Sequence, residues 1–172
     1  VITTKKLMDK KILASLEIDA ILLKYKIEET KEIRRAKYQD EMKWIIKNKK
    51  RNNFITDMCL NLKGNTLILF QYVDEHGKIL HNMLKEKISD ERKCFFIHGG
   101  TDVELREEIR HIVEENEDAI IVASYGTFST GISIRKLHNI IFASPSKSRI
   151  RVLQSIGRQL RKSEGKKVAK LY

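Results

Sequence analysis

The feature that most constrains the fold is an alternation, from Asn65 onward, of short apolar runs with amphipathic stretches. The runs are continuous rather than broken by polar residues, which is typical of strands buried on both faces of a parallel sheet. The stretches between them place apolar residues at helical spacing. We therefore expect an α/β fold, a parallel sheet with helices on both faces. The expected strands are 66–70, 94–97, 119–123, 139–143 and 168–172.

Helices are expected between the strands and in the first third of the chain. The segment 124–133 reads instead as a polar loop. Gly64 is a natural end for the helix before the first strand. We interpret residues 1–50 as a connector with a leading helix, and residues 51–172 as the main domain. The expected helices are 32–48, 53–62, 74–88, 102–116 and 146–162.

Composition excludes several classes of protein. The chain has 172 residues, 41% of them hydrophobic, with one proline and eight glycines, so collagen-like and disordered chains are excluded. No apolar run approaches the roughly 20 residues of a membrane-spanning helix, so we expect no membrane contact. Cys59 and Cys94 have apolar neighbours and are expected to be reduced core thiols. Because the first residues include neither Met nor a signal peptide, we expect a segment of a longer cytosolic chain.

Charge is distributed unevenly along the chain. The net charge of +11 favours a polyanionic partner. From Arg135 onward eleven basic residues accompany the single acid Glu164, whereas 72–118 carries thirteen acids and seven bases. Two regions of opposite charge indicate two faces with different functions; a merely solvated basic surface is the alternative.

Polar segments follow each expected strand, at the edge where parallel sheets bind ligands. These segments are Gln71, 98–100, 124–133 and 144–148. The hydroxyls and two glycines of 124–133 suit an anion-binding loop, and an ordinary strand-to-helix turn is the alternative. The glycines of 98–100 suit either a backbone contact or a simple turn.

The predicted helix 146–162 carries the sharpest pattern. Arg151, Gln154, Arg158 and Arg161 are spaced by 3, 4 and 3 residues, which places them on one side of a helix. Guanidinium groups aligned on a rigid helix suit phosphate oxygens, although a solvated basic face would give the same pattern. The residues predicted to form a buried stripe beside them are Ile150, Leu153, Gly157 and Leu160.

Two segments resemble nucleotide-binding motifs but do not match them. The segment 165–167 resembles the end of a P-loop, but Leu160 stands where the first glycine is required and Lys167 replaces the Ser or Thr that holds Mg²⁺. The segment 74–76 resembles an acidic box but is one residue short, and Asp74 is expected to cap a helix. No Cys/His group has metal-ligand spacing, so no metal site is expected.

The order of the polar segments resembles that of superfamily 2 helicases. The segment 154–161 is similar to motif VI, Q-x-x-G-R-x-x-R, and 124–133 is similar to motif V. The segment 66–73 is similar to motif IV, and 95–100 has the position of the nucleic-acid-contacting segment that follows it. The agreement spans residues 50–172. This part of the chain resembles the second RecA-like domain of such helicases, and most of all the second domain of the DNA helicases of T-even bacteriophages.

The resemblance implies a two-lobed motor with ATP between the lobes. A first lobe would hold the P-loop, the acidic box and Mg²⁺, and residues 1–50 would lead from it. Arg158 and Arg161 are implied to be the catalytic arginines that reach the γ-phosphate. The implied ATP-binding residues are Gln154, Gly131, Ser133 and Gly157. The implied DNA-binding residues are Gln71, His98, Gly99, Gly100, Ser124 and Thr127.

The resemblance also implies a cellular role. The full-length protein would unwind branched or forked DNA in recombination, repair and replication restart, as a monomer in the cytoplasm of an infected bacterial host. Its partners would be that DNA and the first lobe; the chain alone would hold no cofactor and hydrolyse no ATP. Two alternatives are a non-catalytic nucleic-acid-binding module and the motor half of a double-strand DNA translocase.

Overall fold

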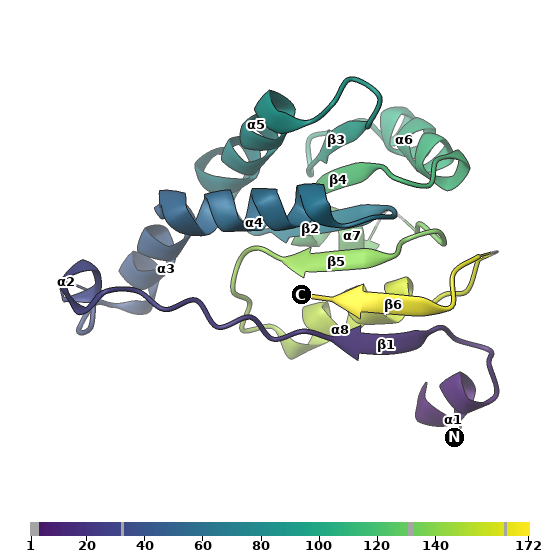
Figure 1. Ribbon diagram of the computed structural model, residues 1–172, viewed down its shortest axis with the longest axis horizontal. Coiled ribbons are helices and arrows are strands. Elements are labelled where there is room, and N and C mark those ends of the chain that lie inside the picture. Colours follow the sequence, from purple (N-terminus) through teal and green to yellow (C-terminus); the bar gives the residue numbers. More distant parts are fainter. Residues whose placement is uncertain (1–3, 32, 131–132, 164) are drawn as a thin grey trace.

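The computed structural model describes residues 4–31, 33–130, 133–163 and 165–172 (Figure 1). Its centre is a parallel six-stranded sheet in the order β1-β6-β5-β2-β4-β3. This confirms the expected α/β class and every strand predicted from the apolar runs, within one residue at each end. The strands are β1 Ser15–Ile18, β2 Thr66–Phe70, β3 Cys94–Ile97, β4 Ile120–Ser124, β5 Asn139–Phe142 and β6 Val168–Leu171.

Helices cover both faces of the sheet, and β2 shows why. Leu67 and Leu69 point to one face, where they pack with α6, α7 and α8, whereas Ile68 and Phe70 point to the other, with α4 and α5. Each fully buried side chain of this size contributes about 1.5–3 kcal/mol, so both layers are firmly attached. The helices on the sheet are α4 Lys49–Asn61, α5 Lys78–Lys87, α6 Val103–Glu115, α7 Tyr125–Thr130 and α8 Arg149–Gln159.

Several helix boundaries differ from the prediction. The stretch predicted as one helix over 32–48 is helical only as α3, Tyr38–Lys47, and α4 then begins at once because the Asn48 side chain accepts a hydrogen bond from Arg51 N (3.0 Å). A short helix, α2, covers Ile27–Thr30. A π-helical turn, η1 Val73–Gly77, precedes α5, so Asp74 lies inside a turn and pairs with Lys78 instead of capping a helix.

The predicted polar loop after β4 is wrong over its first half. It forms α7, whose Tyr125 and Phe128 are almost fully buried against the sheet. The helix forms because these two rings, three positions apart, pack on one side of it. Its hydroxyl-rich sequence gives little sign of this packing.

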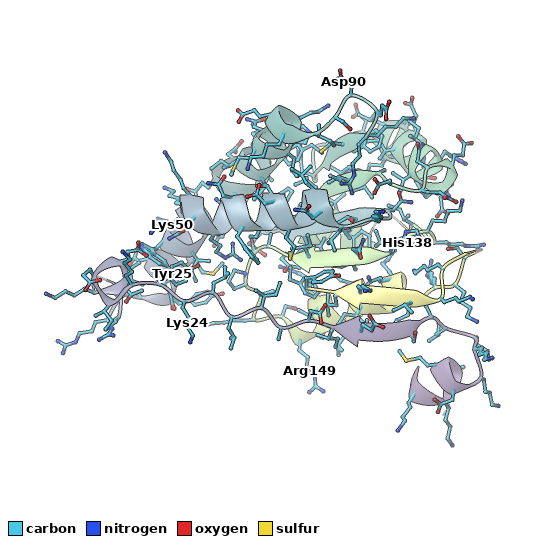
Figure 2. All side chains as sticks on the ribbon, in the orientation of Figure 1. Lys24, Tyr25, Lys50, Asp90, His138 and Arg149 are labelled. Atoms are coloured by element: carbon cyan, nitrogen blue, oxygen red, sulfur yellow. The ribbon has the colours of Figure 1, made fainter. Side chains whose placement is uncertain are left out.

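The first residues contribute to the same sheet. After α1, Thr4–Asp9, the strand β1 pairs with β6 in parallel, although it lies within the predicted connector. Its side chains are largely exposed, so no buried apolar run marks it in the sequence. Beyond β1 the chain runs extended past the strand ends toward α2 and α3 (Figure 1), where Tyr25 meets Trp44 edge-on at 4.9 Å. Tyr25 and its neighbour Lys24 lie on this extended stretch in Figure 2.

Composition led to expectations for the two cysteines and for membrane-spanning helices. Cys59 and Cys94 are buried free thiols in the core, as expected, and burial raises the pKa of each, to about 12 and about 11. Among the described residues, no helix combines the length and the apolar character needed to cross a bilayer.

Candidate functional site

The carboxyl ends of the strands gather several of the predicted residues at one edge. Gln71 follows β2, Ser124 ends the neighbouring strand β4, and His98 follows β3, so the three occupy adjacent positions along this edge. Gln71 and the backbone of residues 99–100 are exposed, and Gly100 N donates to His98 Nδ1 (3.1 Å). The edge therefore offers amide and imidazole groups to solvent.

Thr127 is the exception among the predicted edge residues. Its side chain is only 4% exposed, and its hydroxyl is hydrogen-bonded to Ser124 Oγ (2.8 Å). Thr127 N also donates to Ser124 Oγ (3.3 Å), so the residue fixes the Ser124 hydroxyl at the start of α7. Of this pair, only the half-buried Ser124 reaches the surface.

A buried polar network lies directly behind the edge, and no sequence motif predicts it. His76 is fully buried, with Nε2 3.2 Å from Asn52 Oδ1 and Nδ1 2.9 Å from Ser144 Oγ. Since Asn52 Oδ1 can only accept, His76 carries its proton on Nε2, and its Nδ1 accepts from the Ser144 hydroxyl. Ser144 Oγ in turn accepts from Gln71 N (3.1 Å), and Tyr125 OH donates to Ser144 O (2.7 Å).

The network is held in a neutral state. Burial first, and the Arg51 guanidinium second, lower the pKa of His76 to about 3. Arg51 Nη2 donates to Ala143 O (2.6 Å), which joins α4 to the end of β5 beside Ser144. The only sequence sign of this network is the position of Ser144, directly after a strand.

The helix α8 is rotated relative to the prediction. The predicted buried stripe is wrong for Ile150, which is 70% exposed, and for Leu153, which is 55% exposed; Gly157 is also exposed, and only Leu160 is buried. The helix packs on the core through Ile156 and Leu160, and it also buries polar side chains, which hydrophobic patterning overlooks. The side chains of Ser155 and Gln159 lie fully buried beneath it.

The Ser155 bond lies within α8, whereas the Gln159 bonds join the helix to the sheet below it. Ser155 Oγ donates to Arg151 O (3.0 Å), and Gln159 Nε2 donates to His138 O (3.0 Å) and Lys170 O (2.7 Å) at the beginning of β5 and the middle of β6. The outward face of α8 therefore presents Gln154 and Gly157 to solvent, with Arg158 half-buried beside them.

Arg151 and Arg161 lie toward opposite ends of this helix. Arg151 is at the carboxyl edge, where its Nη1 donates to Gln71 Oε1 (3.0 Å). Arg161 follows the last turn and donates to the Ser133 hydroxyl. Within the described part of the chain, neither has a carboxylate within ion-pair distance. The predicted site residues thus form two groups, one at the edge and one around Arg161.

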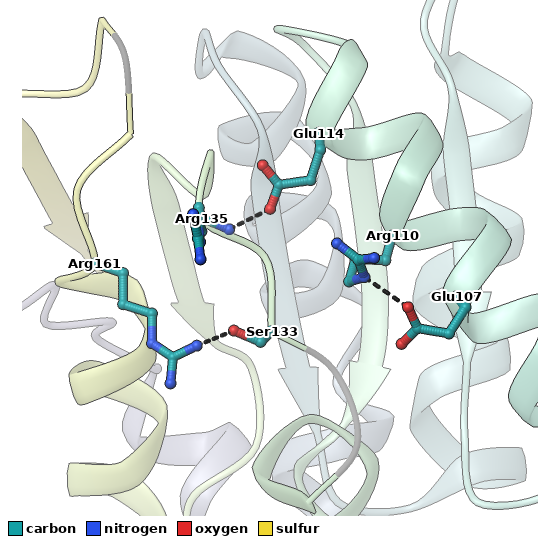
Figure 3. Close-up of a pocket in the computed structure, with 6 residues that line it drawn as sticks. All are labelled: Glu107, Arg110, Glu114, Ser133, Arg135 and Arg161. Atoms are coloured by element: carbon teal, nitrogen blue, oxygen red, sulfur yellow. Dashed lines mark hydrogen bonds and ion pairs between the residues drawn. The ribbon is translucent and has the colours of Figure 1, made fainter.

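The group around Arg161 lines a cavity of about 500 Å³ (Figure 3). Arg161 and Ser133 point toward each other on one side of it. On the other side Glu107 accepts from Arg110 Nε (2.7 Å), and Glu114 accepts from the backbone N of Arg135. Three guanidinium groups and two carboxylates therefore border the cavity. Gly131, predicted to contact nucleotide, lies outside the described residues.

Lys166 joins the two segments that carry Arg135 and Arg161, which both line this cavity. It is 3% exposed, and its ammonium donates to the carbonyl oxygens of Arg135 (3.1 Å), Arg161 (3.0 Å) and Gln159. A cation at the carbonyl end of α8 also interacts favourably with the helix dipole. Burial lowers the pKa of Lys166 to about 8, opposed in part by Glu114. Its segment is a turn at Gly165 leading into β6, which differs from the strand-loop-helix context of a P-loop.

The expectation that the chain has no metal site concerns groups of His, Cys, Asp and Glu side chains. Across residues 4–31, 33–130, 133–163 and 165–172, no group of three or more His, Cys, Asp or Glu side chains is arranged to hold a metal ion.

Comparison with known proteins places this geometry in a family. The helicase conserved C-terminal domain matches residues 47–163. The ATP-dependent DNA helicase uvsW of Enterobacteria phage T4 is 37% identical over 174 residues, which cover 99% of this chain and 34% of that protein. The chain thus spans about a third of this curated relative.

Solved structures give the same assignment. The crystal structure of T4 UvsW matches 92% of this chain and 32% of its own, with a TM-score of 0.77 and 36% identity. The yeast DEAD-box splicing factor Prp28 shares the fold at 16% identity, with a TM-score of 0.56 over 70% of this chain and 25% of its own. The expected RecA-like fold and the expected resemblance to phage helicases are both confirmed. The chain belongs to the helicase conserved C-terminal domain family, as a carboxyl-terminal lobe of superfamily 2.

Proposed function

We propose that this chain is the second motor lobe of an ATP-dependent DNA helicase that acts on branched or forked DNA in recombination, repair and replication restart. One observation carries the proposal: Arg161 borders the 500 Å³ cavity held by a serine hydroxyl and by no carboxylate of the described residues. A guanidinium oriented by a neutral partner keeps its full charge for an added phosphate. The relative uvsW, an ATP-dependent DNA helicase, supports the choice of DNA.

The nucleotide-facing surface would be the outward face of α8 together with Ser133. Arg158 and Arg161 are the proposed catalytic residues, because cations that meet the γ-phosphate stabilise the charge that spreads over it during transfer. Gln154 and Gly157 are exposed on the same helix, just before Arg158, and would border the same nucleotide. Gly131 remains a proposed member of this surface on the basis of sequence alone.

ATP itself would be held mainly by a first lobe. The sequence of this chain has no P-loop and no acidic box, the two motifs that bind the triphosphate and Mg²⁺ in such motors. This chain would supply the arginines and close over the bound nucleotide. We accordingly propose residues 51–172 as the lobe and residues 1–50 as the connector, which also adds β1 to the lobe's sheet.

The DNA track would run along the carboxyl edge. Gln71, His98 and Ser124, with the backbone of Gly99 and Gly100, are placed to contact sugar and phosphate groups, and Thr127 would orient Ser124. Contacts of this kind give sequence-independent, salt-sensitive binding.

The helix α8 would couple the two sites. Its 11 residues, about 16 Å long at 1.5 Å per residue, join Arg151 at the DNA edge to Arg161 at the nucleotide cavity. ATP bridging both lobes would move α8 as a rigid unit, and hydrolysis would release it, so each cycle changes the grip on DNA. We propose that the protein does this as a monomer in the cytoplasm of an infected bacterium.

Substitution of the proposed catalytic arginines tests the function. In the full-length protein, Arg158→Ala and Arg161→Ala should each lower DNA-stimulated ATP turnover by about 10³- to 10⁵-fold, the range measured for arginine fingers. DNA affinity should change little, because the cavity is separate from the carboxyl edge. Arg149→Ala is the matched control, since Arg149 lies on the same helix and projects away from the sheet (Figure 2).

Other outcomes would support the alternatives. Equal losses of DNA affinity and ATP turnover would indicate that Arg158 and Arg161 contact DNA. Full-length protein that binds DNA with no ATP turnover would indicate a binding module. Turnover and movement along duplex DNA without strand displacement on a fork would indicate a translocase.

A further inference from the structure

A pocket at the carboxyl edge adjoins the proposed DNA track and is lined by Tyr38, Tyr72 and Lys147, which have no role so far. This edge pocket has a volume of about 240 Å³ and is bordered by the end of β2, the segment between β5 and α8, and the first turn of α3. In Figure 1 the arrowheads of β1, β5 and β6 point toward the side on which α3 lies. The pocket therefore adjoins Gln71 and extends the proposed DNA track toward α3.

Aromatic and cationic side chains line the edge pocket together. Tyr38 is 40% exposed and Tyr72 is 37% exposed, so both residues reach the surface at the pocket. Lys147 and Arg151 supply positive charge, and none of the described residues that line the pocket is Asp or Glu. Rings beside cations, without carboxylates, are the combination by which proteins bind the bases and phosphates of single strands.

Neutral partners hold both cations in place. Lys147 Nζ lies 3.7 Å from the centroid of the Tyr38 ring, a cation–π contact. Arg151 Nη1 donates to Gln71 Oε1 (3.0 Å), which leaves its charge uncompensated by that partner. In the described structure neither cation forms an ion pair. Both are thus oriented yet able to attract an anion.

We propose that the edge pocket binds one nucleotide of single-stranded DNA, with its base stacked on Tyr72 and its phosphates contacted by Arg151 and Lys147. Tyr38 is a positioning residue that holds the Lys147 ammonium. In duplex DNA the bases stack on one another, so only a separated strand offers a base face to Tyr72. The inference rests on the proposed DNA-binding function and adds a base contact to a track otherwise made of backbone contacts.

The test compares single-stranded and duplex DNA. Binding of the full-length protein to a fluorescent oligothymidylate of about 12 nucleotides is measured by anisotropy, within the site sizes usual for single-strand binders. Tyr72→Ala should weaken binding about 5- to 150-fold, the equivalent of one lost base stack, while Tyr72→Phe should bind normally. Phe54→Ala is the matched control, because Phe54 is 38% exposed but lies on α4, away from the pocket.

Salt dependence tests the two cations separately. Lys147→Ala and Arg151→Ala should each reduce the slope of log K against log salt by about 0.7, the value for one phosphate contact on a single strand. Lys10→Ala, at an exposed lysine after α1, should leave the slope unchanged. Tyr38→Ala should reproduce the slope change of Lys147→Ala, and Tyr38→Phe should restore the original slope.

Three results would overturn the edge-pocket proposal. One is unchanged oligothymidylate binding by Tyr72→Ala; another is an equal loss with Tyr72→Phe; the third is an equal loss on a blunt duplex. If Tyr72→Ala proves unfolded by thermal melting, Tyr72→Leu keeps the apolar bulk without the ring and decides the same question. The proposed function fails separately: it falls if the Arg158 and Arg161 variants hydrolyse ATP normally, whatever happens at Tyr72.

Discussion

His76 shows how one buried side chain can organise an exposed edge. Its neutral ring accepts a hydrogen bond from the Ser144 hydroxyl, and that hydroxyl oxygen accepts one from the backbone N of Gln71. A proton added to Nδ1 would remove the acceptor on which this chain of hydrogen bonds depends. The position of Ser144 after a strand does not reveal the arrangement, because Asn52, His76 and Ser144 come from three separated segments and only the fold brings them together.

Acid should destabilise the chain through His76. Its pKa is lowered to about 3 in the folded state from an ordinary value of 6.5, so below pH 6.5 the unfolded state binds the proton first and stability falls. Between pH 7 and pH 5 this residue alone should cost about 2 kcal/mol of unfolding free energy, measured by urea denaturation at both pH values. His76→Asn should remove that part of the loss.

Two other histidines serve as internal references. His81 and His138 also have a pKa lowered chiefly by burial, and they titrate in both proteins. The difference between wild type and His76→Asn therefore isolates His76. The same pH-dependent loss in both proteins would show that His76 accepts a proton as easily in the folded chain as in the unfolded one.

Among the elements, strands were predicted well and helix faces poorly. Continuous apolar runs located β2 to β6 because burial on both sides leaves no polar alternation. β1 was missed because its side chains are exposed, and α7 because two buried rings support an otherwise polar sequence. The orientation of α8 could not be derived, since Ser155 and Gln159 bury polar groups against backbone partners that sequence patterns do not reveal.

The candidate site was predictable only in part, for a similar reason. Residues directly after strands, such as Gln71 and Ser124, follow from the parallel topology, which brings all carboxyl ends to one edge. The edge pocket was not predictable, because Tyr38 meets Lys147 across more than a hundred residues of chain. Contacts between loops and a helix outside the sheet leave no periodic signal.

The orientation of α8 can be tested by stability. Ile150→Lys and Leu153→Lys should change the unfolding free energy of the chain by no more than about 0.5 kcal/mol, as for other surface substitutions, because both side chains are exposed. Leu160→Ala should cost about 2–5 kcal/mol, since Leu160 is 3% exposed in a core cluster with Ala14 and Ala169. Urea titration measures all three variants. If Ile150→Lys or Leu153→Lys lowered the unfolding free energy by several kcal/mol, these side chains would be buried, as the sequence pattern predicts.

At the scale of the whole molecule, the groups proposed to bind phosphate occur without the motifs that activate one. Arg161 and its cavity lie at one end of α8, and the proposed DNA edge lies at the other. The sequence that builds them contains neither a P-loop nor an acidic box. Under the proposed function this lobe would sense ATP and bind DNA, and hydrolysis would require a second set of residues that holds the triphosphate and Mg²⁺.

The isolated chain should therefore bind DNA without hydrolysing ATP. Its affinity should fall as salt rises, because binding depends on phosphate contacts and a net charge of +11. Phosphate release with DNA and Mg²⁺ present should stay at the level of the blank, whereas the full-length protein turns over ATP in the same buffer. The Arg158→Ala form of the full-length protein is the control for contaminating ATPase, since it keeps the first lobe but loses a catalytic arginine. Turnover by the isolated chain above that control would mean that these residues bind and activate ATP themselves, and the two-lobe assignment would have to be abandoned.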